Sequence, residues 1–179
     1  TLLKNHNLHV EIQIDRTTPV GSTDLAGITD VLTESALSTI MDCEDSVAAV
    51  DVTDKLLVYR NWLGLMRGTL SASLTRDGTT MQRTLAKDRA WTTPEGGPLT
   101  LPGRSLMLVR TVGFHMFTDA VLDTEGQPVP VHLLDAAIVS AAAPHHLNAN
   151  GPHRNIRAVP VYILRPQMPC PAEIALSHA

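Results

Sequence analysis

Acidic residues crowd the chain directly behind a short apolar run, and this pattern limits the possible folds more than any other. Residues 42 to 51 read DCEDSVAAVD, so three carboxylates fall within four positions. The apolar run at 37 to 41 predicts a buried strand that ends at these acids. Ligands of α/β folds lie where such strands end, so Asp42, Glu44 and Asp45 indicate a hard-metal or polar-substrate site. A cluster of acids capping a helix N-terminus has the same local pattern and stays an alternative.

Predicted strands and helices alternate through the first half of the chain. Apolar and polar residues alternate over 8 to 14, which predicts a strand with one solvated face. Helical spacing of apolar residues predicts a helix from Ser22 to Ala36, with Ser22 as its N-cap. A second helix is expected to begin at a Thr53 cap and to end near Gly68.

The second half continues the alternation after a hairpin. Asp77-Gly78 lies between Ser/Thr-rich extended stretches, which predicts a β-hairpin turn. A loop rich in Pro and Gly leads into an apolar strand over 106 to 109 that ends at Arg110. Pro130 is expected to open a helix over 131 to 143. The remaining expected elements are a strand over 159 to 164 and a helix beginning near Pro171.

Near-continuous apolar strands that alternate with helices are typical of a parallel sheet covered by helices. The predicted fold class is therefore α/β, with the polar hairpin as an insertion. Arg110 ends one of the apolar strands, where a guanidinium is costly to desolvate unless it meets a carboxylate or an anionic ligand. Alternatively, Arg110 has a structural role and pairs with Glu44 or Asp45 across neighbouring strands. One residue can do both, so the ligand-binding and structural interpretations are compatible.

Composition excludes several classes of protein. The chain has 179 residues, a net charge of -4 and two each of Trp, Tyr and Phe, which argues against a nucleic-acid binder. No apolar run approaches the roughly 20 residues of a membrane span, so no membrane partner is expected. Cys43 and Cys170 are too few for a disulfide framework, which favours a soluble, cytoplasmic protein. The acids beside Cys43 should raise its pKa, so a thiolate nucleophile is not expected.

Four stretches together resemble one enzyme family. TIMDCEDSVAAVDVTDKLLVYRNWLGLMRGTL at 39 to 70 is similar to the G-type malate synthases, which condense acetyl-CoA with glyoxylate. LLKNHNLHVEIQID at 2 to 15, GRSLMLVRTVG at 103 to 113 and VYILRPQMPCPAE at 161 to 173 fit the family in the same order. The chain is accordingly expected to be a central piece of a longer enzyme.

The resemblance implies a fold and a reaction. The expected fold is a partial TIM (β/α)8 barrel segment with part of an inserted α/β domain. Residues 1–36 and 68–104 would belong to the inserted domain, and residues 37–67 and 105–179 to the barrel. The implied reaction is a Mg²⁺-dependent Claisen condensation of acetyl-CoA with glyoxylate and water that yields malate and CoA. The full-length enzyme is expected to be monomeric.

The resemblance also assigns roles around the acidic stretch. Arg110 matches an arginine that contacts glyoxylate and stabilises the enolate formed from acetyl-CoA. Glu44 and Asp45 lie at the Mg²⁺ site, where carboxylates one shell out orient metal-bound waters. Asp42 and Asp51 are expected to be structural only.

Acetyl-CoA is expected to contact Ser46 and Arg83, which match family positions that bind it.

Two segments depart from the family pattern. After the arginine that Arg110 matches, the family usually has Val-Gly-His, but here Phe114 follows Val-Gly and displaces the histidine to position 115. Where the family has Lys-Pro-Lys-Met-His-Gly, this chain has Arg-Pro-Gln-Met-Pro-Cys at 165 to 170.

The family's direct Mg²⁺ ligands and its general base lie downstream of the matched region, so the chain alone is expected to be inactive. Two alternatives stay open. A non-catalytic acyl-CoA-binding module would need neither Glu44 nor Asp45, and another Mg²⁺-dependent TIM-barrel carbon–carbon lyase would use similar residues.

Overall fold

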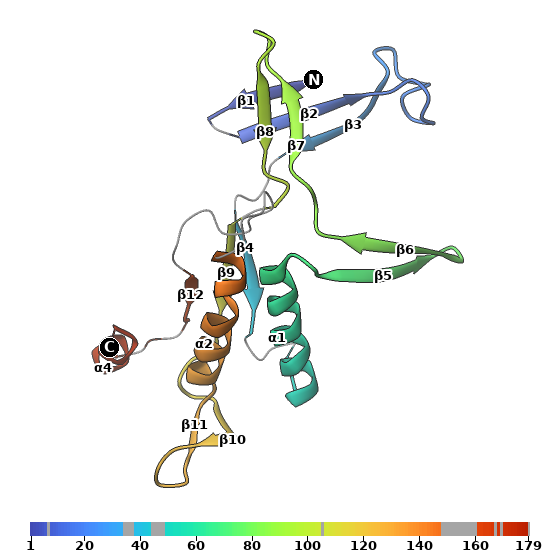
Figure 1. The fold of residues 1–179 in the computed structure, drawn as a ribbon. Helices are drawn as coiled ribbons and strands as arrows, with labels where there is room; N and C mark the ends of the chain where they lie inside the picture. The colour runs from blue at the N-terminus through green and yellow to red at the C-terminus, as the bar shows by residue number, and fades with distance from the viewer. Residues whose placement is uncertain are drawn as a thin grey trace. The chain divides into compact units, whose positions relative to one another are not determined.

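The computed structural model describes residues 1–6, 8–33, 38–43, 49–104, 106–147, 161–166, 168 and 170–178. The chain divides into two compact units, Thr1–Leu37 and Ser38–Ala179. Figure 1 labels most of the elements of both. Among the helices of these ranges, none is long and apolar enough to cross a membrane.

The first unit is an antiparallel sheet. Its strands are β1 (Leu2–Asn5), β2 (Leu8–Ile14) and β3 (Ile28–Thr33), in the order β1-β2-β3. The predicted strand over 8 to 14 is confirmed as β2. The predicted helix from Ser22 to Ala36 is wrong, because β3 occupies much of that range and pairs with β2, with Val31 opposite Ile12.

Local sequence explains this error. Asp24 accepts hydrogen bonds from the backbone N–H groups of Ala26 and Ile28, at 2.9 and 2.8 Å, and so closes a turn where the helix was expected. The strand that follows is rich in β-branched residues, which fit a pleated surface better than a helix.

The second unit is built on a parallel sheet. Its strands are β4 (Ser38–Asp42), β9 (Leu106–Arg110) and β12 (Tyr162–Leu164), in the order β12-β9-β4. Both pairings are parallel, and the register places Arg110 opposite Asp42 on one side and Leu164 on the other. The predicted α/β class with a parallel sheet is confirmed. The described strands form small separate sheets, and they do not close into a barrel.

Among the described residues, three helices lie between these strands in the chain and a fourth follows β12. They are α1 (Val52–Arg67), α2 (Val131–Ala142), α3 (Pro144–Leu147) and α4 (Pro171–His178). The predicted Thr53 cap of α1 is wrong. Asp51 is the N-cap, since its Oδ1 accepts from the backbone N–H groups of Thr53 at 2.8 Å and Asp54 at 2.9 Å. Gly68 ends the helix as predicted, with a φ of 73° that a glycine adopts without strain.

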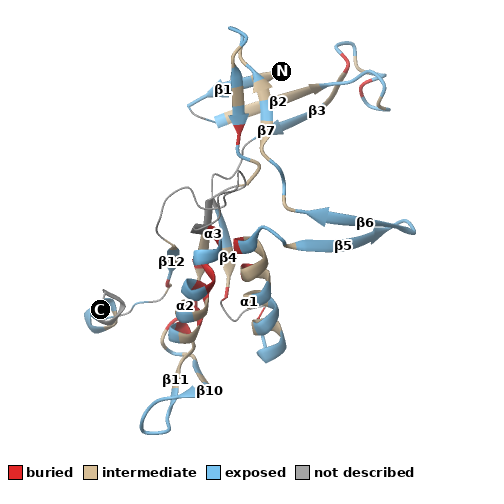
Figure 2. Cartoon of the chain, in the orientation of Figure 1, coloured by how far each residue is buried: buried red, intermediate tan, exposed pale blue. Residues whose placement is uncertain are grey.

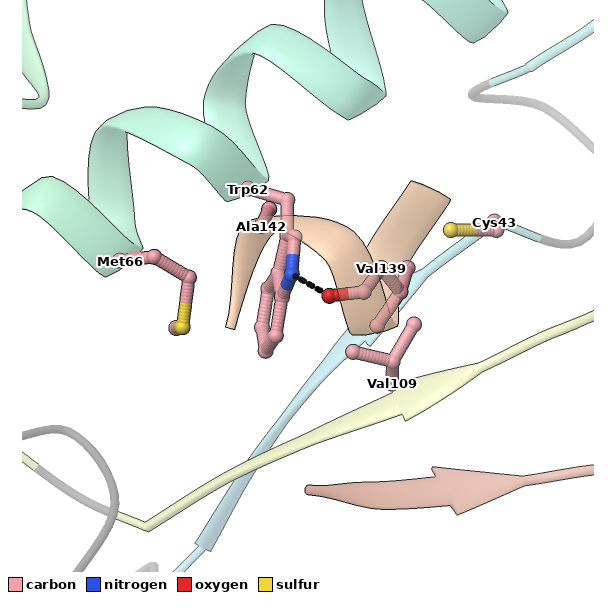
Figure 3. Packing of buried hydrophobic residues seen from close by; sticks show 6 residues of the cluster. All are labelled: Cys43, Trp62, Met66, Val109, Val139 and Ala142. Atoms are coloured by element: carbon pink, nitrogen blue, oxygen red, sulfur yellow. Dashed lines mark hydrogen bonds between the residues drawn. The ribbon is translucent and has the colours of Figure 1, made fainter. Parts of the chain in front are cut away.

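Helices α1 and α2 pack together against one face of the parallel sheet. The buried cluster consists of Cys43, Trp62, Met66, Val109, Val139 and Ala142. Figure 3 shows the indole of Trp62 on α1 donating its Nε1–H to the carbonyl of Val139 on α2, at 3.1 Å. This hydrogen bond satisfies the one polar atom of a fully buried tryptophan.

The opposite face of the sheet is uncovered in the described part of the chain. Side chains alternate between faces along a strand, so those of Ile40 and Asp42 lie opposite that of buried Cys43. Ile40 is 50% exposed, and Leu164 is 44% exposed. By the same alternation Arg110 lies on the face opposite buried Val109. Asp42 and Arg110 therefore share the uncovered face, at the carboxyl ends of their strands.

The described part of the second unit also contains three hairpins. They pair β5 (Ser71–Arg76) with β6 (Thr79–Thr84), β7 (Arg89–Thr92) with β8 (Pro98–Leu101), and β10 (Phe117–Leu122) with β11 (Pro128–Pro130). The predicted turn at Asp77-Gly78 is confirmed, with φ values of 50° and 75° that suit a tight hairpin turn. Every residue of β5 and β6 is exposed, as the pale blue hairpin of Figure 2 shows.

Candidate functional site

Arg110 and Asp42 form an ion pair where β9 and β4 end. Arg110 donates from Nε to Oδ1 of Asp42 at 3.1 Å, and its Nη2 donates to Oδ2 of the same carboxylate. Two parallel donors on one carboxylate form a fork, which fixes the orientation of the guanidinium. The Arg110 side chain is 36% exposed and that of Asp42 is 33% exposed. The strand end thus presents a cation whose direction is fixed and which solvent still reaches.

The alternative interpretation of Arg110 was an ion pair with Glu44 or Asp45, and both of these acids lie outside the described residues, as does Ser46. The observed partner is Asp42, which the parallel register places directly opposite Arg110. Asp42 and Asp51 were expected to be structural. The ion pair of Asp42 and the N-cap role of Asp51 agree with that expectation.

Arg83 lies on β6 of the exposed hairpin, opposite Ala72. Within the described ranges no hydrogen bond or ion pair joins Arg83 to Arg110 or Asp42. Of the predicted site residues, the structure therefore brings Arg110 to the carboxyl edge of the sheet and leaves Arg83 in a separate two-stranded sheet.

A buried polar network lies on the helix side of the same strand ends, and the sequence alone did not reveal it. Asp135 on α2 is 0% exposed, and both of its carboxylate oxygens lie 3.1 Å from Nζ of Lys55 on α1. Tyr59 donates its hydroxyl to Oδ1 of Asp135 at 2.5 Å. Lys55 also donates to the backbone carbonyl of Cys43, the residue after β4. The available signals were a single acidic residue in a mostly apolar helix, and a Lys and a Tyr four residues apart on another helix.

Burial and the contacts with Asp135 raise the pKa of two groups in and beside this network. Burial, with the charge of Asp135 second, raises the pKa of the Cys43 thiol to about 12. The predicted direction is confirmed, although burial rather than the adjacent acids is the main cause. Burial and the hydrogen bond to Asp135 raise the pKa of Tyr59 well above its usual range. Cys43 is thus no nucleophile at neutral pH, and Tyr59 keeps the proton that it donates.

A second buried cluster follows β9 and includes two of the departures from the family pattern. The hydroxyl of Thr111 and Nδ1 of His132 are 2.7 Å apart, and the ring of Phe114 meets the His132 ring edge-on at 5.1 Å. Cζ of Arg165 lies 3.9 Å from the centre of the Phe114 ring, a cation–π contact. Burial, with Arg165 second, lowers the pKa of His132. His115, the displaced histidine, is exposed.

A cavity of about 360 Å³ lies beside the Lys55 network. Its wall comes from the residues before and at the start of α1, from the segment between β9 and α2, and from one side of α2. Most of the lining is apolar, and Lys55 and Tyr59 are among its polar members. Among the residues that the structure describes, no group of three His, Cys, Asp or Glu side chains is placed to hold a metal ion.

Comparison with known proteins identifies relatives of the whole chain. No family model matches it. The chain is 51% identical to malate synthase G of Halalkalibacterium halodurans, 41% to that of Corynebacterium efficiens and 40% to that of Corynebacterium glutamicum. Each alignment covers 177 residues, which is 99% of this chain and 24% of the relative. The chain thus spans about a quarter of the length of these curated relatives, and the resemblance expected from the motifs is confirmed.

Proposed function

Because the chain is homologous to a segment of malate synthase G over nearly its whole length, we propose that its protein condenses acetyl-CoA with glyoxylate and water to give malate and CoA. The observation that supports this reaction best is Arg110, which the Asp42 fork holds at the carboxyl end of a parallel strand. Active sites of α/β barrels lie at that end of the strands.

We further propose that the parallel sheet is a segment of a TIM barrel. Three parallel strands follow one another in chain order, α1 and α2 cover one face, and the other face bears the half-exposed side chains of Ile40, Tyr162 and Leu164. Such a face suits a barrel interior. Residues 37–67 and 105–179 would supply the barrel, and residues 1–36 and 68–104 the inserted domain.

Arg110 would act on charge that develops during the reaction. Removing a proton from the methyl group of acetyl-CoA moves negative charge onto the thioester oxygen, and a fixed cation stabilises that charge more than the neutral substrate. The same guanidinium attracts the carboxylate of glyoxylate. Asp42 keeps the fork in place, so little reorganisation is needed when the charge forms.

Mg²⁺ would be held through bound waters by Glu44 and Asp45. Carboxylate oxygens are donors of the kind that Mg²⁺ prefers, and the ion keeps several waters when few side chains bind it directly. Asp42, the nearest described acid in the sequence, is already engaged by Arg110. When bound, the metal would supply Lewis-acid polarisation of the glyoxylate aldehyde.

Acetyl-CoA would be recognised by Ser46 and Arg83. A hydroxyl and a guanidinium suit the polar and phosphorylated parts of the cofactor. Arg83 is exposed, so a phosphate reaches it without desolvating a buried charge. The protein would act in the cytoplasm, where acetyl-CoA is available, and as a monomer.

The test is turnover of the full-length protein. CoA release from acetyl-CoA should require both glyoxylate and Mg²⁺, and malate should form in equal amount. The 179-residue chain alone should release none. CoA binding without turnover and without dependence on Mg²⁺ would instead identify an acyl-CoA-binding module. Turnover with a different carbonyl acceptor, and not with glyoxylate, would identify another carbon–carbon lyase.

A further inference from the structure

Arg110 has a different neighbour on each side at the carboxyl edge of the parallel sheet. Strand β9 lies between β4 and β12, and the register pairs Arg110 with Asp42 on one side and with Leu164 on the other. Residues that are paired in this way stand on the same face of a sheet. All three therefore share the face that the helices of the described part leave uncovered. The guanidinium is bordered there by a carboxylate and by an apolar side chain.

Charge decides on which side of Arg110 an anionic substrate is favoured. Asp42 accepts both hydrogen bonds of the Arg110 fork, so its negative charge lies on the β4 side. A second carboxylate is repelled from that side and is attracted on the side away from Asp42. Glyoxylate carries a carboxylate, so its favoured place is on the β12 side of the guanidinium, beside Leu164.

The backbone around Leu164 is held firmly, while its side chain is open. The carbonyl of Leu164 accepts from the N–H of Thr111 at 3.0 Å. Ile163 packs against the buried cluster on the helix side, and Arg165 is buried and donates from Nη2 to the carbonyl of Glu173 at 3.1 Å. The Leu164 side chain is nevertheless 44% exposed. It has no donor or acceptor, so it can influence a bound molecule only through its shape.

We propose that Leu164 is a specificity-determining residue that selects the carbonyl acceptor of the condensation by size. Its side chain lies against the aldehyde carbon of the acceptor, where glyoxylate bears a hydrogen and other 2-oxo acids bear an alkyl group. A methyl group at that carbon, as in pyruvate, overlaps with the leucine. The inference rests on the proposed function, because it needs an acceptor that Arg110 holds. Apolar contacts of this kind discriminate one carbon by about 10- to 200-fold.

The experiment compares two acceptors in the full-length protein. We measure kcat/KM for glyoxylate and for pyruvate by CoA release, at saturating acetyl-CoA and Mg²⁺. Leu164→Ala removes the branched end of the side chain, and the ratio of the glyoxylate value to the pyruvate value should fall about 10- to 200-fold. Inhibition of glyoxylate turnover by pyruvate gives a second measurement that does not require pyruvate to react, and it should strengthen in the variant. A thermal melt should stay near that of the wild type, because truncating a half-exposed side chain leaves no buried cavity.

Two control variants separate size selection from a structural role. Leu164→Ile keeps the volume of the side chain and should keep the wild-type ratio. Ile40→Ala is the matched control, because Ile40 is 50% exposed on the same face and pairs with Leu108, one layer away from Arg110. It should leave both the ratio and the inhibition by pyruvate unchanged.

Two results would count against different parts of the argument. A folded Leu164→Ala variant that loses turnover equally with both acceptors, or that keeps the wild-type ratio and pyruvate inhibition, would overturn size selection and leave the proposed reaction intact. A wild-type protein that releases no CoA with glyoxylate would overturn the proposed reaction, and the inference with it.

Discussion

Replacing Arg110 by Lys in the full-length protein tests whether this residue acts in the reaction or only in folding. Lysine keeps a positive charge at the end of β9 but replaces the planar fork by a single ammonium. The two parallel hydrogen bonds to Asp42 cannot both be reproduced. We expect turnover to fall much more than glyoxylate affinity, because the guanidinium is assigned mainly to charge that appears in the transition state.

The size of the expected energy change distinguishes a role of Arg110 in the reaction from a role in folding. Both side chains of the Arg110–Asp42 pair are about one-third exposed, and exposed pairs contribute roughly 0 to 1 kcal/mol to stability. The variant should therefore fold nearly as well as the wild type. Losing one donor to a developing oxyanion costs about 2.7 to 4 kcal/mol of barrier, or roughly a hundredfold to a thousandfold in turnover.

The measurements are turnover and glyoxylate affinity at saturating Mg²⁺, with a thermal melt of each variant. Asp42→Asn is a useful companion, because it leaves the guanidinium in place and removes the charge that orients it. Its turnover should fall less than that of Arg110→Lys. A folded Arg110→Lys variant with near wild-type turnover would refute the argument and leave Arg110 a structural ion-pair partner of Asp42.

Three further predictions concern single residues. Asp51→Ala removes the N-cap of α1 and should destabilise the helix start by about 1 kcal/mol, seen as faster hydrogen exchange in its first turn. Iodoacetamide at pH 8 should label exposed Cys170 and leave Cys43, with its pKa near 12, unlabelled; mass spectrometry of the tryptic peptides decides. Because the pKa of His132 is lower in the folded than in the unfolded state, stability should fall as pH decreases through about 6.5. Urea unfolding of His132→Gln should show a smaller loss over the same range, and an equal loss would contradict the assignment.

Sequence patterns predicted the elements whose local and tertiary preferences agree. Strand β9 has an apolar run, the hairpin after β5 has its Asp-Gly turn, and α1 has both helical spacing and a terminal glycine. The helix expected from Ser22 fails because Asp24 closes a turn there and the β-branched residues that follow favour a strand, which pairs with β2. The cap of α1 was misplaced by two residues, since both Asp51 and Thr53 are good N-cap types.

Prediction of the site was limited in a different way. Arg110 at a strand end was predicted, because an apolar run that stops at an arginine is visible in the sequence. Its contact with Asp42 depends on the register between two strands that lie far apart in the chain. Asp135 was missed for the same reason, since its partners Lys55 and Tyr59 come from another helix. Pair contacts of this kind arise from packing and leave no periodic signal.

The long excursion between β4 and β9 has a consequence for how such a chain evolves and folds. Roughly sixty residues, including α1 and two hairpins, separate two strands that pair along their whole length. Closing a loop twice as long costs only about 0.6 kcal/mol more, so hairpins can be gained at this point without weakening the sheet noticeably. The long separation instead lowers the rate of folding. Pairing over such a separation is slow, so the β5–β6 hairpin should form well before β4 meets β9 during refolding.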